Sequence, residues 1–173
     1  MSIRSRRVQN QPLIIGECRL NLTPNAARRS YAEELKYVAH IKSDALVRAF
    51  AKVPREKFLG PGPWRIPWGQ EHWTTEDDNP NHIYHNVLVA IDPVRHLNNG
   101  EPGFLAFLID ALEIKAGEHV AHIGCGTGYY SAILAEVVGK KGRVIAVEID
   151  QKLAARSWLR TGQAAGSAWS TRS

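Results

Sequence analysis

The residues best suited to chemistry lie in the stretch 119–150. Gly124, Gly126 and Gly128 follow a short apolar run, and the carboxylate of Glu148 ends the next run. Glycine adopts backbone angles closed to other residues and lets a ligand approach the main chain with no Cβ in the way. A carboxylate at the tip of a strand suits a ribose, because it accepts hydrogen bonds from two adjacent hydroxyls. These residue types predict a site for a nucleotide-like ligand.

The elements that must position these residues have βαβ order. An apolar run at 119–123 leads into the glycine turn, a helical pattern closes at Gly139, and a second apolar run spans 144–147. The first turn of the helix points its free N–H groups toward a ligand above the glycines. The alternative is a glycine-rich turn in an unrelated α/β protein, but turn, helix and acidic strand end agree with one another.

The glycine spacing separates two kinds of nucleotide site. A dinucleotide pattern, G-x-G-x-x-G, would place its third glycine at position 129, which is Tyr129. The observed G-x-G-x-G resembles motif I of the S-adenosylmethionine-dependent methyltransferases, and this resemblance implies S-adenosyl-L-methionine as the cofactor. The candidate cofactor-binding residues are then Gly124, Cys125, Gly126, Gly128, Glu148 and Ile149. We interpret Cys125 as a small packing residue of the turn rather than as a nucleophile.

Composition is ordinary for a globular protein and bounds its location. The 173 residues, 44% hydrophobic and 23% charged, suit one domain with or without an appendage. We find no apolar run of membrane-spanning length and no secretory signal at the start. Two cysteines, Cys18 and Cys125, give no disulfide framework, which favours a reducing cytoplasm. The sequence therefore predicts a cytoplasmic protein with no membrane partner.

The formal net charge of +5 is concentrated near the start of the chain. The arginines crowded there are Arg4, Arg6, Arg7, Arg19, Arg28 and Arg29. A basic arm of this kind binds nucleic acid in some proteins, but it is more often a solvated tail. We expect residues 1–23 to be a flexible arm and do not expect nucleic acid as the partner.

Two helices and a short signature follow the arm. Apolar spacing predicts helices over residues 25–42 and 44–53, the second capped by Ser43 and ended by Pro54. The segment V-P-R-E-K-F, Val53–Phe58, then resembles the "VPRE-x-F" signature of the protein-L-isoaspartate O-methyltransferase family. With motif I in the right order behind it, the resemblance implies methylation of damaged aspartyl residues in proteins. The implied partner is a protein or peptide substrate with isoaspartyl residues.

Residues 60–82 read as a long loop with no secondary structure of its own, containing Trp64, Trp68 and Trp73. The tryptophans either cover a substrate cleft or attach the loop to the core, and we favour attachment. His82 and His85 suggest a metal site, but they have no helical context and no cysteine cluster. We therefore predict no metal.

A strand and a helix are expected before the glycine turn. Residues 84–91 contain an apolar run that predicts a strand, and Asp92 and Pro93 end it. A turn at residues 98–100 then precedes a helix with Pro102 in its first turn. The stripe expected to be buried on this helix comprises Phe104, Leu105, Leu108, Ile109 and Leu112.

The resemblance has one chemical departure, at Gly100. In the family a Ser-x-Pro motif opens the helix before motif I, and its serine lies beside the methyl donor and the substrate. Here the motif falls on Gly100, Glu101 and Pro102, so the hydroxyl is absent. Asn98 or Asn99 could replace it, or the methyl acceptor could be a different one. The candidate catalytic positions are Asn99 and Gly100.

A second departure follows Asp150. Family members continue through further strands to a seven-stranded sheet, whereas here residues 151–156 begin a helix and 157–173 lose helical periodicity. The expected fold is α/β: a partial Rossmann-like methyltransferase fold in which residues 24–117 form an N-terminal helical and loop region and 118–156 the partial nucleotide-binding core. An exposed sheet edge would favour covering by N-terminal segments or by another copy in an oligomer. The alternative to an enzyme is a shortened, inactive relative that acts as a binding module.

Overall fold

A computed structural model of the chain describes residues 22–69 and 71–161, with side chains described up to residue 156. The helices are α1 (Pro24–Val38), α2 (Asp44–Lys52), α3 (Glu56–Leu59), α4 (Pro102–Ala111), α5 (Tyr129–Val138) and α6 (Gln151–Thr161), with a 3-10 helix η1 (Pro80–Ile83). The strands are β1 (Arg65–Trp68), β2 (Glu71–Thr74), β3 (Ala90–Asp92), β4 (Leu97–Asn98), β5 (His119–Ile123) and β6 (Arg143–Val147). The expected arm, 1–23, lies almost wholly outside the described residues.

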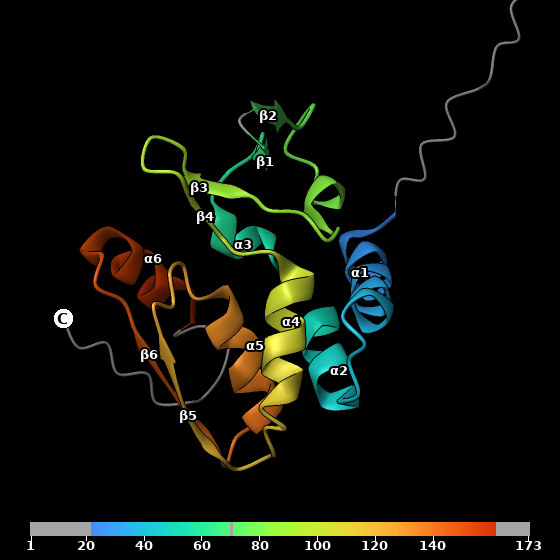
Figure 1. Cartoon of the computed structure of the whole chain (residues 1–173), viewed down its shortest axis with the longest axis vertical. Coiled ribbons are helices and arrows are strands. Elements are labelled where there is room, and N and C mark those ends of the chain that lie inside the picture. The colour runs from blue at the N-terminus through green and yellow to red at the C-terminus, as the bar shows by residue number, and fades with distance from the viewer. Residues whose placement is uncertain (1–21, 70, 162–173) are drawn as a thin grey trace, which may run out of the picture.

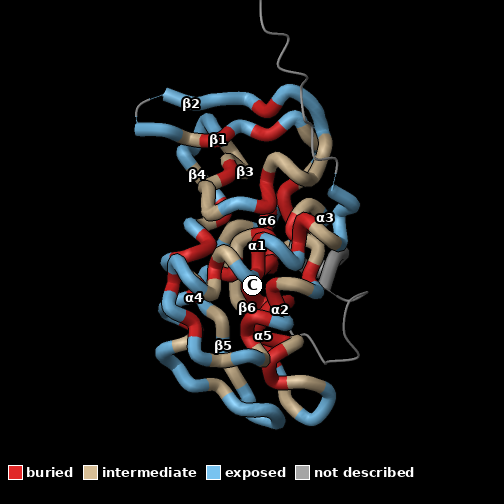
Figure 2. The backbone as a smooth tube through the Cα atoms, turned by 90° about the vertical axis from the view of Figure 1, so that its right-hand side faces the viewer, coloured by how far each residue is buried: buried red, intermediate tan, exposed pale blue. Residues whose placement is uncertain are grey.

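Three helices, α1, α2 and α5, form the main core (Figures 1 and 2). Four fully or almost fully buried aromatic rings join them: the ring centroids of Tyr31 and Phe50 lie 6.1 Å apart, those of Phe50 and Tyr129 6.3 Å, and those of Phe58 and Tyr129 5.6 Å. Large rings bury much apolar area and favour such edge-on contacts. The helices, rather than a sheet, therefore supply most of the main core.

The helix starts follow the capping signals in the sequence. Ser43 is the N-cap of α2, as predicted, and its Oγ accepts a hydrogen bond of 3.3 Å from the Leu46 amide. The carboxylate of Asp110 on α4 accepts two more amides at this end, from Lys42 and Ser43. The first helix, α1, has Thr23 as N-cap and ends at Val38, shorter than the expected span to residue 42. Capping thus fixes α2 against α4.

The predicted strand, glycine turn, helix and strand are confirmed in β5, α5 and β6. The two strands are parallel, with His119 opposite Arg143 and Ile123 opposite Val147. Side chains alternate between faces, so Val144 and Ala146 are buried on one face while Ile145 is exposed on the other. Helix α5 packs against this unit, which forms the left side of Figure 1.

The expectation of a featureless loop at 60–82 is wrong. In that stretch β1 and β2 pair as an antiparallel hairpin, and η1 follows. Pro67 lies inside β1, and proline in a short run lowers the strand signal of a sequence. Trp64 attaches the segment to the core, buried and donating from Nε1 to the Gly60 carbonyl at 3.1 Å, whereas Trp68 and Trp73 are exposed.

The strand expected over residues 84–91 is also much shorter than predicted. Only Ala90–Asp92 is β-structure, and it pairs with β4 rather than with the β5–β6 sheet. The apolar run before it is held instead by side-chain contacts, described below. At the other end, α6 continues to Thr161, so residues 157–161 are helical rather than irregular; residues 162–173 lie outside the described part.

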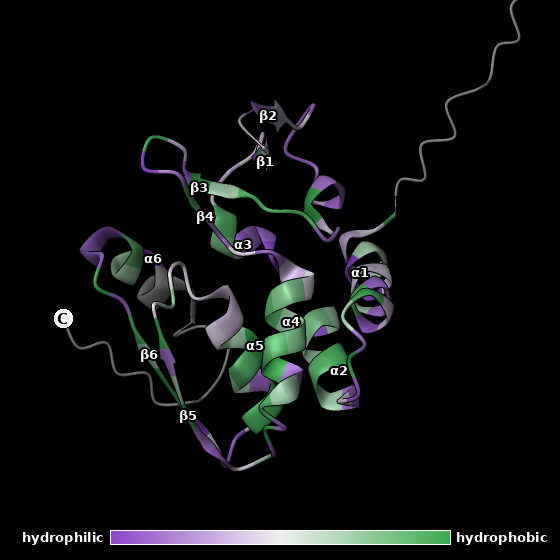
Figure 3. Ribbon diagram, viewed as in Figure 1, coloured by the Kyte–Doolittle hydropathy of each residue, from purple (hydrophilic) through white to green (hydrophobic). Residues whose placement is uncertain are grey.

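The buried face of α4 matches the predicted stripe only in part, at Ile109 and at half-buried Leu105. Ala106 and Ile109 are buried, but Phe104, Leu108 and Leu112 are exposed by 43% or more. The helix carries apolar residues on nearly all sides (Figure 3), so its sequence pattern does not select one face. Packing against α1 and the α2 terminus makes the selection.

We expect Ser43→Ala to lower the free energy of unfolding by about 1 kcal/mol, because the Leu46 amide loses its cap. Ser43→Asp is the matched control and should retain most of the stability, since a carboxylate also caps this position. Urea denaturation followed by tryptophan fluorescence measures both. Equal loss in the two variants would contradict the capping role.

Candidate active site

The glycine turn after β5 presents bare main chain. Gly124, Gly126 and Gly128 have φ values of 72°, 56° and 88°, in the left-handed region that favours glycine. A Cβ built on Gly124 or Gly126 would meet no atom within 4 Å. These two glycines are therefore dictated by backbone conformation, and the space above them is open to a ligand.

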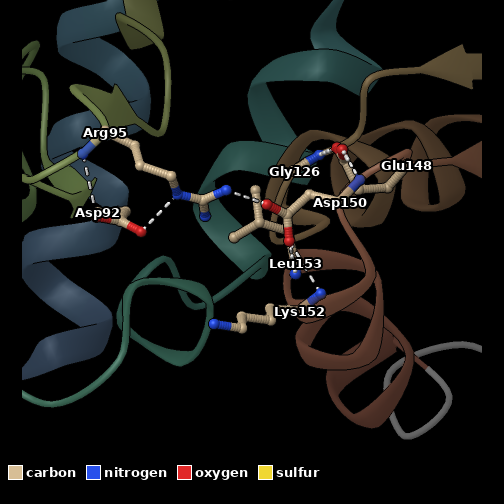
Figure 4. A network of polar contacts seen from close by, with 7 residues as sticks. All are labelled: Asp92, Arg95, Gly126, Glu148, Asp150, Lys152 and Leu153. Atoms are coloured by element: carbon tan, nitrogen blue, oxygen red, sulfur yellow. Dashed lines mark hydrogen bonds and ion pairs between the residues drawn. The ribbon is translucent and has the colours of Figure 1, made fainter.

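Glu148 faces this turn from the end of β6 (Figure 4). One carboxylate oxygen accepts the Gly126 amide at 2.6 Å and the other accepts the Asp150 amide at 3.0 Å. The next residue, Ile149, is 96% exposed. A carboxylate held in this way lies within reach of a ligand over the turn. The exposed Ile149 side chain offers an apolar surface next to it.

A cavity of about 170 Å³ joins the glycine turn to the segment before α4. Its lining includes Asn98, Asn99, Gly100, His122, Gly124, Cys125, Gly126, Thr127 and Tyr130. The structure therefore brings both predicted catalytic positions together with three predicted cofactor positions. Gly128 lies just below as the N-cap of α5, and Glu148 reaches the turn without lining the cavity. Ile149 is outside it.

Gly100 has a backbone that explains the absent serine. Its φ of 77° is left-handed, and an added Cβ would lie 3.2 Å from the Leu105 side chain. The Tyr130 hydroxyl donates to the Gly100 carbonyl at 3.2 Å, and the Gly100 amide donates to Asn98 Oδ1 at 2.9 Å. The segment is thus fixed in a shape that disfavours any side chain at position 100.

Asn99 faces the interior. Its Oδ1 accepts the Val89 amide at 3.0 Å and a guanidinium N–H of Arg55 at 3.3 Å. The side-chain Nδ2 is buried and has no hydrogen-bond partner among the described residues. The side-chain Oδ1 of Asn99 therefore anchors the segment, a role that the sequence did not indicate.

The V-P-R-E segment holds the chain between η1 and β3. The buried guanidinium of Arg55 donates to three main-chain carbonyls, those of Ile83 at 2.6 Å, His85 at 3.0 Å and Val87 at 2.7 Å. Glu56 accepts the hydroxyl of Tyr84, whose pKa is raised by burial and by this carboxylate. Sequence reasoning missed both roles, although three consecutive charged residues, 55–57, between Pro54 and Phe58 were the available signal.

Arg95, in the turn between β3 and β4, links this turn to the start of α6 (Figure 4). It forms ion pairs with Asp92, at 2.7 Å, and with Asp150. The Arg95 guanidinium lowers the pKa of both carboxyl groups. Asp150 also accepts the amides of Lys152 and Leu153 as a cap of α6. No sequence signal connected Arg95 with Asp150, which are 55 positions apart.

His122 lies at the base of the cavity. Its Nδ1 is 2.8 Å from the Ser131 Oγ on α5. Burial lowers the pKa of His122, and the nearby Glu148 carboxylate opposes this shift only in part. The structure thus favours a neutral imidazole beside the turn.

The other histidines of interest have separate partners. His82 Nε2 lies 2.8 Å from an oxygen of Asp77, and His85 Nδ1 lies 3.8 Å from an oxygen of Glu34. Across residues 22–69 and 71–161, no three His, Cys, Asp or Glu side chains are grouped as a metal site would need. None of the described helices is long and apolar enough to cross a membrane.

The parallel βαβ unit, its bare glycine turn and the carboxylate at the second strand end define a protein of the Rossmann-like fold class. The family described as protein-L-isoaspartate (D-aspartate) O-methyltransferase matches residues 27–167. Because this match covers most of the sequence, the chain belongs to that family.

Three relatives share the name protein-L-isoaspartate O-methyltransferase. That of Methanococcus aeolicus is 32% identical over 118 residues, 68% of this chain and 46% of the relative. Protein-L-isoaspartate O-methyltransferase 2 of an Anaeromyxobacter species is 30% identical, over 78% of this chain and 47% of the relative. The Thermotoga maritima protein is 28% identical, over 64% of this chain and 31% of the relative. The chain therefore spans about half or less of the length of these relatives.

Solved structures support the fold. A protein-L-isoaspartate O-methyltransferase superposes with a TM-score of 0.57 at 23% identity, covering 84% of this chain and 41% of its own. A Plasmodium falciparum protein assigned as a beta-aspartate methyltransferase was solved with S-adenosyl-L-homocysteine. It superposes with a TM-score of 0.57 at 20% identity, covering 79% of this chain and 56% of its own. The expected partial methyltransferase fold is confirmed.

We expect the protein to lose stability at acidic pH through His122. Because its pKa is lowered on folding, the unfolded chain binds this proton more readily, and the free energy of unfolding falls as the pH drops below the ordinary histidine range. His122→Gln removes the titration and keeps a polar group toward Ser131. Melting temperatures between about pH 7.5 and about pH 5 should fall less in this variant than in the wild type.

The matched control for this measurement is His119→Gln, an exposed position on the same strand. Its melting temperatures should follow the wild-type curve. Parallel curves for wild type and His122→Gln would show that His122 does not contribute the acid sensitivity.

Proposed function

We propose that the protein is an S-adenosyl-L-methionine-dependent O-methyltransferase that methylates the carboxylates of damaged aspartyl residues in proteins, such as the free α-carboxylate of an isoaspartyl residue. The observation that carries this proposal is the cavity in which the segment 98–100 lies against the glycine turn, in a chain of this family. Methyl transfer requires donor and acceptor sites in direct contact, because the enzyme's main contribution is to align the two reactants.

The cofactor side is assigned to groups that fit such a ligand. The open space above Gly124 and Gly126 accepts the methionine portion against bare main chain, with Cys125 and Gly128 completing the turn. Glu148 accepts the ribose hydroxyls, in exchange for the amide contacts it now makes. Exposed Ile149 offers an apolar surface to the adenine ring. When bound, S-adenosyl-L-methionine supplies an electrophilic methyl group.

The acceptor side needs alignment rather than a strong base. A carboxylate is already a nucleophile, so no residue of the site would have to remove a proton from it before it received the methyl group. Tyr130 and Asn98 fix the main chain at Gly100, and Asn99 anchors it from behind. Position 100 has no side chain, so no hydroxyl contacts the acceptor carboxylate there. A cytoplasmic location is proposed with this function, on the basis of the few cysteines.

Binding of S-adenosyl-L-homocysteine tests the cofactor side. We expect Glu148→Gln to weaken this binding about tenfold, since hydrogen bonds to a charged acceptor contribute more than those to a neutral one. Isothermal titration calorimetry measures the affinity, and Glu33→Gln, an exposed carboxylate on α1, is the control. No heat from the wild type at high protein concentration would contradict the proposed cofactor.

Methyl incorporation tests the acceptor. An isoaspartyl peptide should accept methyl groups from labelled S-adenosyl-L-methionine well above its aspartyl twin of the same sequence. The twin controls for charge and composition, because only the backbone linkage differs. Equal, background-level incorporation combined with normal cofactor binding would indicate another acceptor, consistent with the altered position 100. Absence of both would favour the inactive binding module.

A further inference from the structure

A larger cleft of about 530 Å³ lies between the β1–β2 hairpin and the β3–β4 ribbon. Its apolar lining comes from both sides and includes Pro67, Leu88, Pro93, Val94 and Leu97. Asn98 lines this cleft and also the small cavity beside the glycine turn. The cleft and the small cavity, where the proposed methyl transfer occurs, therefore adjoin at Asn98.

The ionisable side chains directed toward the cleft are an arginine and two histidines. In the hairpin, Arg65 pairs with Thr74 and Pro67 with His72, so Arg65 and His72 project from one face. Arg65 Nη2 lies 2.5 Å from a ring nitrogen of His72. The turn after β3 adds His96 from the opposite wall.

The nearest carboxylates are directed or engaged elsewhere. Glu71 borders the cleft, but its partner in the register is Trp68, which places the Glu71 side chain on the face opposite Arg65. Asp92, at the end of β3, is paired with Arg95. The guanidinium of Arg65 thus faces the cleft without a carboxylate beside it among the described lining residues.

We propose that this cleft binds the acceptor polypeptide and selects acidic side chains next to the methylated residue, with Arg65 as the principal contact. The inference rests on the proposed function and adds its substrate preference. The apolar lining accommodates the main chain of the peptide, and the Arg65 guanidinium meets its negative charge.

The lining favours a peptide over a nucleic acid. Single-stranded nucleic acids bind on aromatic platforms beside a basic groove. No tryptophan, tyrosine or phenylalanine is among the described lining residues, and Trp68 and Trp73 lie outside them. The fixed positive charge of one arginine is also small for a phosphate backbone, which needs several cations.

Peptide binding to the full chain tests this proposal. The probe is a fluorescein-labelled isoaspartyl peptide with glutamate on both sides of the isoaspartyl residue, compared with its lysine-flanked twin. Fluorescence anisotropy in the presence of S-adenosyl-L-homocysteine at low salt should show about fivefold tighter binding of the glutamate peptide, a difference that salt screens. Arg65→Glu should reverse the order of the two peptides.

Arg48→Glu is the matched control, because it reverses the charge of an exposed arginine on α2 that does not line the cleft. It should leave the preference for the glutamate peptide unchanged. Equal affinities for the two peptides, no binding of either, or an unchanged order in Arg65→Glu would overturn the proposal. Displacement of the peptide by an equal concentration of a short oligonucleotide would also overturn it, as an unselective anion site.

The two proposals fail separately. Calorimetric binding of S-adenosyl-L-homocysteine depends on the glycine turn and Glu148, which Arg65 does not contact in the structure. Normal cofactor binding with no charge preference would refute only the cleft assignment. A charge preference without cofactor binding would refute the methyltransferase function and leave an acidic-peptide site.

Discussion

The buried guanidinium of Arg55 is the interaction on which the acceptor side depends. A buried charge is costly unless hydrogen bonds compensate it, and no carboxylate among the residues that the structure describes pairs with this one. Three main-chain carbonyls, the Asn99 side chain and the face of the Tyr31 ring, 5.7 Å from the guanidinium carbon, surround it instead. Because its acceptors come from residues 83–87 and from Asn99, one side chain fixes a segment that has little regular secondary structure. Loss of any acceptor would leave the charge under-solvated, so the segments are held together as a unit.

Two further links connect this acceptor side to the nucleotide-binding unit, and they differ in strength. Tyr130 is buried on α5 and donates to the Gly100 carbonyl, so the first link is protected from solvent. Arg95 bridges Asp92 and Asp150 with a side chain that is 45% exposed, where ion pairs contribute little and are screened by salt. The buried link therefore sets the distance between Gly100 and the glycine turn. The exposed link orients the loop after β6 without much effect on stability.

The parts of the site that are local in sequence were predictable. Gly124, Gly126, Gly128 and Glu148 lie in one βαβ unit, whose turn and strand end are placed by backbone geometry alone. The role of Arg55 was not predictable, because its acceptors are carbonyls about 30 positions away and any residue type provides a carbonyl. The β1–β2 hairpin was not predicted because Pro67 lowers the strand signal of its sequence. Helix α4 is apolar on so many sides that only packing selects its buried face. Position 100 was flagged as a departure, but its left-handed backbone became evident only in the structure.

The arrangement also explains how a two-stranded sheet positions a site. Parallel sheets are usually covered on both faces, yet Ile123 and Ile145 are exposed on the face of β5–β6 away from α5. Two parallel strands alone bury too little surface to be stable. The opposite face rests on α5, whose Tyr129 is packed between Phe50 and Phe58 in the helical core. The glycine turn leads directly into this helix through Gly128, and the Gly124 and Cys125 amides donate to the Val147 carbonyl of β6 at 2.8 Å and 3.1 Å. The aromatic cluster and the end of β6 therefore hold the turn in place together. Tyr130, the next residue, extends from the same helix to the acceptor segment, and one rigid helix thereby positions both walls of the cavity.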